Sequence, residues 1–274
     1  MPIRLLVPGL LFSFFLSNIN AQTDTLPADF RVKGVAIGIS APELVDQMMV
    51  VMPGLGSNAK AMMNQQSVKP YLMPPREVGQ RGTVMSYLLS ACMEFYSNYR
   101  KNYKVNLSPD FVALSLAREG STDLKNALRF LVTDGTVSAD IVPYDSPSIP
   151  RSAGASEKYR ISNYLQVFRE SQRESQKVFE TQKALMRGNP VIVEMLAPPG
   201  FDKVTKTRFW TSTGRASGDA KVLPFLVVSY NLELESFEVL SAWGQEWGSD
   251  GYIWIDFNDF GKIALNGFVM VPEQ

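Results

Sequence analysis

The sequence predicts an α+β fold, because helix-type and strand-type segments are segregated along the chain instead of alternating. Helix signals dominate residues 86–135, and a further helical stretch follows at about 171–188. Short β-branched and aromatic runs separated by turns then fill residues 191–271. A chain of 274 residues can bury a large core, so we expect one large domain or two closely packed halves.

Caps and helix breakers place the helices. Residues 86–96 are apolar nearly all round, which is typical of a buried central helix. The predicted helices are 86–96 with Ser86 as N-cap, one starting at Ser108-Pro109, one starting at Thr122 or Asp123 and ending near Gly135, a polar one from about Ser171 to Gly188, and a short one over about 41–52 ended by Gly54-Leu55-Gly56.

The predicted strands are short and mostly late in the chain. One early stretch, 32–39, is also strand-like. The others are 191–193, 223–230, 237–240, 252–255 and 268–271.

Composition excludes several classes of function. The chain has no histidine, which is the usual general base near neutral pH and the commonest metal ligand. Its single cysteine, Cys92, rules out an intramolecular disulfide and a thiolate metal cluster, and its place in the central helix indicates a buried structural thiol. Lys and Arg total 27, as do Asp and Glu, so nothing favours nucleic acid as a partner. We expect no metal and no cofactor.

Residues 1–21 have the pattern of a secretory signal peptide. Arg4 supplies the positive charge, residues 5–16 form an apolar run, and Ala21 ends Asn18-Ile19-Asn20-Ala21, the expected cleavage site before Gln22. The run is shorter than the roughly 20 apolar residues that a membrane span needs. We therefore expect an exported protein, secreted or periplasmic, with no stable membrane insertion after cleavage. A retained N-terminal anchor helix is the alternative.

Two blocks of sequence resemble papain-like cysteine peptidases. Gln80-Arg81-Gly82-Thr83-Val84-Met85-Ser86-Tyr87 is similar to the active-site block that precedes and opens the central helix of that family. Ser241-Ala242-Trp243-Gly244-Gln245-Glu246-Trp247-Gly248, followed by Gly251-Tyr252, is similar to the family's Asn-Ser-Trp-Gly-x-x-Trp-Gly-x-x-Gly-Tyr signature. The resemblance covers roughly residues 70–274.

The resemblance implies a domain scheme. It predicts a signal peptide at 1–21, an N-terminal extension at 22–69 and a papain-like domain at 70–274. Within that domain we expect a helical half at about 79–145 and an antiparallel, barrel-like half at about 185–274. The extension does not match the family's inhibitory propeptide, because it is shorter and lacks the charged repeating pattern.

The resemblance also implies that the catalytic machinery is missing. Ser86 stands at the position of the nucleophilic Cys, Leu223 at that of the His and Ser241 at that of the Asn, while Gln80 keeps the oxyanion-hole position. These three replaced positions should line a groove between the two halves. A serine hydroxyl needs a base to take its proton, and leucine cannot serve as one.

Three functions remain open. The first is an inactive homologue that acts by binding a protein or peptide, as scaffold or decoy. The second is a hydrolase that uses Ser86 with a non-histidine base such as Lys221, two residues before Leu223 and so on the same face of a strand. The third is a structural component of a cell-envelope assembly that uses residues 22–70 as a contact arm.

Overall fold

The computed structural model describes residues 36–55, 64–101, 104–120, 123–211 and 219–273. The predicted signal peptide lies outside these residues, and so does the first half, 32–35, of the predicted strand at 32–39. Residues from Ala36 onward form one compact unit. Within the described residues, no helix is both long enough and apolar enough to cross a membrane.

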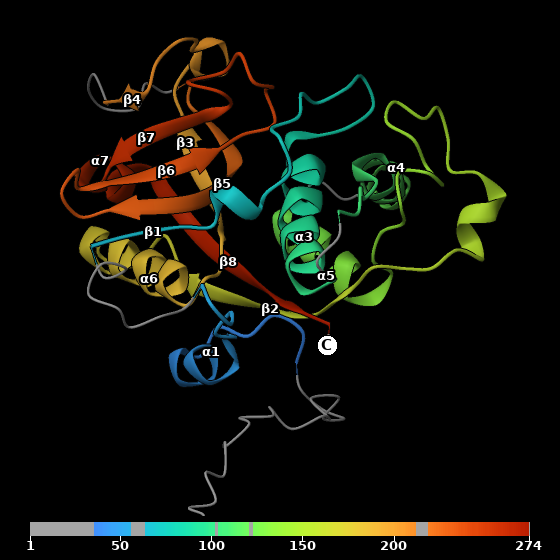
Figure 1. Ribbon diagram of the computed structural model, residues 1–274, viewed down its shortest axis with the longest axis horizontal. Coiled ribbons are helices and arrows are strands. Elements are labelled where there is room, and N and C mark those ends of the chain that lie inside the picture. Colours follow the sequence, from blue (N-terminus) through green and yellow to red (C-terminus); the bar gives the residue numbers. More distant parts are fainter. Residues whose placement is uncertain (1–35, 56–63, 102–103, 121–122, 212–218, 274) are drawn as a thin grey trace, which may run out of the picture. The chain divides into compact units, whose positions relative to one another are not determined.

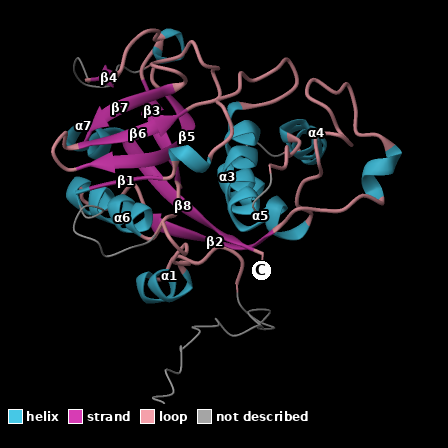
Figure 2. Cartoon of the chain, viewed as in Figure 1, coloured by secondary structure: helices cyan, strands magenta, loops and turns pink. Residues whose placement is uncertain are grey.

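The fold is α+β, as predicted, and Figure 2 shows its helices packed beside a large sheet. The helices are α1 (Pro42–Met48), α3 (Val84–Lys101), α4 (Pro109–Glu119), α5 (Leu124–Thr133), α6 (Glu174–Met186) and α7 (Phe257–Ile263). The strands are β1 (Gln65–Ser67), β2 (Ile161–Phe168), β3 (Val191–Ala197), β4 (Phe209–Trp210), β5 (Lys221–Asn231), β6 (Ser236–Leu240), β7 (Tyr252–Asp256) and β8 (Ala264–Pro272).

The sheet is open, so "barrel-like" describes it only loosely. Its strands follow the order β2-β8-β3-β5-β6-β7-β4, with β1 attached to β5. All pairs are antiparallel except β4 with β7. The path ends at β2 on one side and at β4 on the other, and no pairing among the described residues closes it.

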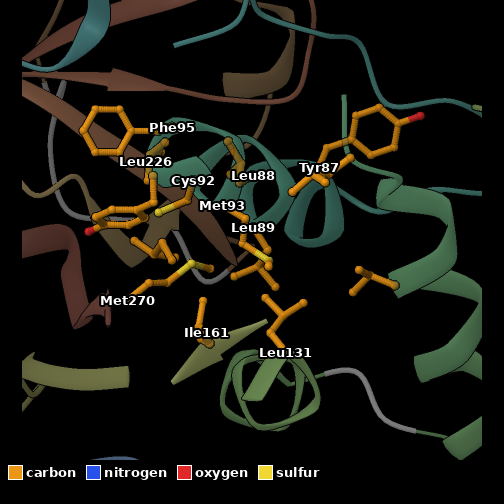
Figure 3. Packing of buried hydrophobic residues seen from close by; sticks show 14 of the residues in the cluster. Tyr87, Leu88, Leu89, Cys92, Met93, Phe95, Leu131, Ile161, Leu226 and Met270 are labelled. Atoms are coloured by element: carbon orange, nitrogen blue, oxygen red, sulfur yellow. The ribbon is translucent and has the colours of Figure 1, made fainter. Parts of the chain in front are cut away.

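The central helix α3 is buried, as predicted (Figure 3). It packs against α4, β5 and β8, and its apolar side chains lie at the centre of one of two hydrophobic clusters. Its buried apolar side chains are Tyr87, Leu88, Leu89, Cys92, Met93, Phe95 and Tyr96. The second cluster lies between the sheet and the helices α6 and α7.

The predicted cap of α4 is confirmed, and Asp123, one of the two residues predicted to start α5, caps that helix. Ser108 accepts a hydrogen bond from Phe111 N (3.0 Å) at the start of α4. Asp123 Oδ1 accepts a hydrogen bond from Asn126 N (2.8 Å) at the start of α5. Gly135 ends this region with a φ of +74°, and a Cβ there would lie 2.2 Å from Tyr159 O. Only glycine fits that turn.

Several elements differ from the prediction; helix α7 and the short strands β1 and β4, for example, were not predicted. Helix α1 ends at Met48 instead of about residue 52, and its N-cap Ala41 offers no side-chain acceptor. Residues 36–38 are not a strand, and Ile39 makes only a single bridge to β2. Strand β2 precedes α6 and was not predicted, because polar residues interrupt its apolar pattern. Those residues are satisfied in place: Gln166 Nε2, for example, donates to Asn266 Oδ1 (3.1 Å).

Candidate functional site

Thr83 caps the central helix, not Ser86 as predicted. Ser86 N donates to Thr83 Oγ1 (3.0 Å) and Tyr87 N donates to Thr83 O (3.1 Å), which are the bonds of an N-cap residue. Ser86 lies three residues further on, where its Oγ accepts a hydrogen bond from Thr83 N (3.1 Å). The two residues therefore form a reciprocal capping box. Both residue types cap helices well, so the sequence pattern alone could not choose between them.

The Ser86 hydroxyl is engaged in this capping box and is fully buried. Its oxygen donates to Thr83 O (3.0 Å) and lies 3.1 Å from Thr83 Oγ1, which donates to it. The residue is 0% exposed, so the expectation that it lines a groove is wrong. A backbone carbonyl does not act as a general base, so this geometry does not activate the hydroxyl as a nucleophile.

Leu223 and Ser241 lie on neighbouring strands. Leu223 is in β5, opposite Met195 of β3, and packs half-buried against the second hydrophobic cluster. Ser241 directly follows β6, and the pairing of Leu226 with Leu240 places it on the sheet face that also carries Leu223. Ser241 is 1% exposed, so it does not line a groove either. Its hydroxyl has no hydrogen-bond partner among the described residues.

An aromatic cluster holds the turn after Ser241. Trp243 and Trp247 meet with ring centroids 5.1 Å apart, and Trp247 Nε1 donates to Phe201 O (2.8 Å). Phe201 and Phe225 complete the cluster, with centroids 5.7 Å apart. The tryptophans of the recognised motif therefore have a packing role that needs no catalytic chemistry.

Gln80 lies exposed on the loop before α3. The loop is fixed on both sides. Val78 N donates to Ala242 O (2.8 Å), and Gly79 N makes a long hydrogen bond to the Tyr87 hydroxyl (3.4 Å). The structure thus brings the loop of Gln80 next to the turn that follows Ser241.

Lys221, the alternative base, is exposed at the start of β5. Its register opposite Ala197, with Leu223 opposite Met195, puts Lys221 and Leu223 on one face of the strand, as predicted. The hydrogen bonds recorded for the Ser86 hydroxyl all go to Thr83. Convergence of Ser86, Leu223 and Ser241 at one point therefore stays a prediction.

A buried polar stripe on α3 escaped the sequence reasoning. Ser86, Ser90, Glu94 and Asn98 recur every four residues and so share one helix face. Ser90 Oγ, Glu94 Oε2 and Asn98 Nδ2 are buried without a hydrogen-bond partner among the described residues. The four-residue spacing was visible in the sequence. The strongly apolar neighbours on the other faces concealed it.

Glu94 anchors the Gln80 loop to the helix. Its Oε1 accepts hydrogen bonds from Arg76 Nη2 (2.9 Å) and from Leu107 N (2.7 Å). The residue is 0% exposed, and burial raises the pKa of its carboxyl, although Arg76 opposes the shift. Arg76 O in turn accepts a hydrogen bond from Gly244 N (3.2 Å). Arg76 therefore links α3, through Glu94, to the turn after β6, through Gly244.

A second buried acid lies under the same loop. Asp110 Oδ2 accepts hydrogen bonds from Asp145 N (3.0 Å) and, at 3.4 Å, from the Tyr87 hydroxyl. Burial raises the pKa of Tyr87 to about 12 and also raises the pKa of Asp110. Both groups are structural supports of the loop, and at neutral pH the tyrosine remains protonated.

No metal site is found in the part of the chain that the structure describes, where no three His, Cys, Asp or Glu residues group suitably. A hollow of about 750 Å³ lies between α6 and α7 and is lined by Arg173, Lys177 and Asn258, among others. A smaller one of about 310 Å³ lies beside Tyr96 and Arg160. Neither is lined by the four residues that the resemblance singled out.

Comparison with solved structures identifies the architecture. The chain is similar to xylellain, a cysteine protease from Xylella fastidiosa, with a TM-score of 0.62 and 16% identity, covering 80% of this chain and 91% of xylellain. The chain has the papain-like fold. The digestive procathepsin L 3 of Tenebrio molitor larval midgut has a TM-score of 0.63 and 15% identity, with 84% of this chain and 78% of that chain covered.

Bromelain from Ananas comosus, solved with the E64 inhibitor, has the same papain-like fold, with a TM-score of 0.59 and 17% identity over 77% of this chain and 99% of bromelain. No protein-family model and no curated protein sequence matches the chain. At these identities the likeness establishes the fold alone.

Proposed function

We propose that this protein is a papain-like fold without peptidase activity that acts by binding a protein or peptide, as scaffold or decoy. The observation that carries the proposal is the state of Ser86. Its hydroxyl is buried in a capping box with Thr83, where it donates a hydrogen bond to the backbone carbonyl of Thr83.

The expected loss of rate is large. Removing the nucleophile and base of a triad costs on the order of 10⁶ in turnover. An oxyanion hole and binding alone leave roughly 10³–10⁴ over the uncatalysed reaction in water. Gln80, at the oxyanion-hole position, contributes only to that small remaining rate, because Leu223 and Ser241 supply no base. Such a rate does not support a working peptidase.

Export is part of the proposal. It rests on the signal-peptide pattern of residues 1–21, and it places the protein in a secreted or periplasmic compartment. The balanced charge argues against nucleic acid as partner. The partner is therefore a protein or peptide that the chain meets after export.

A peptidase assay tests inactivity. The purified protein is incubated with a degenerate peptide library and with E64, and Ser86→Ala and Lys221→Ala are assayed beside it. We expect no cleavage above that of the Ser86→Ala variant and no E64 adduct. Cleavage that disappears in Ser86→Ala would overturn the proposal. If the cleavage also disappears in Lys221→Ala, the protein is a hydrolase that uses Ser86 with Lys221 as its base. Ser90→Ala is the matched control, because it removes another buried hydroxyl of α3.

A further inference from the structure

Residues 36–55, here called the N-terminal strap, cover the outer edge of strand β2. Ile39 N donates to Tyr164 O (3.0 Å), and Gln166 N donates to Ile39 O (2.7 Å). Asn163 of β2 adds two bonds, because its Oδ1 accepts from Gly38 N (2.8 Å) and its Nδ2 donates to Ala36 O (3.2 Å). An uncovered edge strand is a template for pairing with another chain, so the strap protects the sheet from self-association.

The middle of the strap packs on the sheet and on α6. Val45 and Met49 of this region are 3% and 4% exposed and belong to the second hydrophobic cluster. Asp46 lies 2.8 Å from Lys183 Nζ and 3.7 Å from Arg187 Nη1. Exposed ion pairs contribute little energy, so these contacts serve mainly to fix the register of α1 against α6.

The end of the strap closes over Gly188, where α6 stops. Met52 N donates to Arg187 O (2.8 Å), and Asn189 Nδ2 donates to Val50 O (2.6 Å). A Cβ on Gly188 would lie 2.8 Å from the Cβ atoms of both Met52 and Leu55. Met52 and Leu55 are 2% and 4% exposed and join the first hydrophobic cluster.

Two further contacts tie this end to the rest of the fold. The Tyr99 hydroxyl of α3 donates to Pro53 O, and Gln66 Nε2 donates to Leu55 O. The strap therefore contributes buried side chains to both clusters. Its hydrogen bonds and ion pairs, as far as the described residues show them, reach β1, β2 with the adjoining Arg169, α6 with the turn that follows it, and the later part of α3. None reaches Ser86, Leu223 or Ser241.

We propose that the N-terminal strap is a permanent part of the folded domain and not a removable propeptide, so that the working protein begins at or before Ala36. Removing it would open the edge of β2 and uncover apolar side chains of both clusters. This inference is independent of the proposed function. It also leaves residues 36–55 unavailable as a free contact arm for an assembly.

The first test uses the full chain, expressed in an exporting host and processed there. Intact mass and N-terminal sequencing should place the mature N-terminus at or before residue 36. A stable mature form that begins between residues 56 and 83 would overturn the proposal. Hydrogen exchange on the same protein should show the amides of Ile39 and Met52 protected like those of the core sheet. Rapid exchange of the whole strap, with the sheet protected, would contradict the proposal.

A glycine pair gives a second, matched test. Gly188 and Gly200 have φ values of +81° and +78°, so alanine meets the same backbone strain at both. Of the two, Gly188 faces the strap, whereas no atom of the described residues lies within 4 Å of a Cβ at Gly200. Gly188→Ala should therefore lower the Tm by at least about 2–4 °C more than Gly200→Ala does, and increase exchange at Met52. Equal shifts for the two variants would contradict permanent docking of the strap.

Discussion

Ser86→Ala separates a structural serine from a catalytic one. In the structure the hydroxyl accepts from Thr83 N (3.1 Å) and donates to Thr83 O (3.0 Å). A net protein hydrogen bond contributes about 0.5–1.5 kcal/mol. Thr83 is exposed, so water replaces part of what is lost. We therefore expect Ser86→Ala to lower the free energy of unfolding by about 1 kcal/mol, or the Tm by about 2–4 °C.

The control is one helical turn away. Ser90 is 1% exposed and its hydroxyl has no partner among the described residues. Removing an unsatisfied buried hydroxyl is neutral or stabilising, so Ser90→Ala should not lower the Tm. Urea unfolding of both variants, together with Thr83→Ala and the Thr83/Ser86 double variant, measures the coupling. We expect at least about 0.5 kcal/mol between Thr83 and Ser86. If Ser86→Ala leaves the free energy of unfolding unchanged and no coupling between Thr83 and Ser86 is measured, the capping role of Ser86 is refuted.

Three further predictions concern buried polar groups. Because burial raises the pKa of Glu94, the folded state binds that proton more tightly than the unfolded chain does. The free energy of unfolding of the wild type, relative to that of Glu94→Gln, should therefore rise as pH falls from neutral towards the ordinary glutamate pKa of 4.5, and level off below it. Urea unfolding at a series of pH values measures this difference, and a decrease with falling pH would contradict the prediction. Ser241→Ala should leave the Tm unchanged or raise it, whereas a clear loss would reveal a partner for that hydroxyl. Cys92 is buried and its burial raises the thiol pKa, so the Tm should be the same with and without reductant, and a drop of several degrees would indicate an intermolecular disulfide.

The sequence predicted the parts of the fold whose cause is local. The caps at Ser108 and Asp123 and the stop at Gly188 depend on the conformation of a few neighbouring residues, and the structure confirms them. Strand β2 could not be predicted in this way. Its buried Asn163 and Gln166 are stable only because residues distant in the sequence, Ala36 and Asn266, satisfy them.

The candidate site was predicted less completely. The motif alignment put Leu223 in a strand and Ser241 just after another, and the structure shows that these strands, β5 and β6, pair with each other. The position of the Gln80 loop beside the turn after β6, which the Val78 to Ala242 hydrogen bond fixes, was not predicted. Burial was missed, because a motif carries no information about what covers it. Ser86 was assigned to a groove and is instead 0% exposed. The link from Arg76 to Glu94 was also missed, since it joins residues whose types predict surface positions.

Labelling of the intact protein with a fluorophosphonate, an electrophile that reacts with activated serines, tests the central claim most directly. The claim is that the Ser86 hydroxyl serves the fold and has no base. The account predicts that intact mass shows no adduct and that peptide mapping finds Ser86 unmodified after prolonged incubation, while a serine hydrolase in the same tube is fully labelled. A single adduct at Ser86, absent from Ser86→Ala and retained in Ser90→Ala, would contradict it.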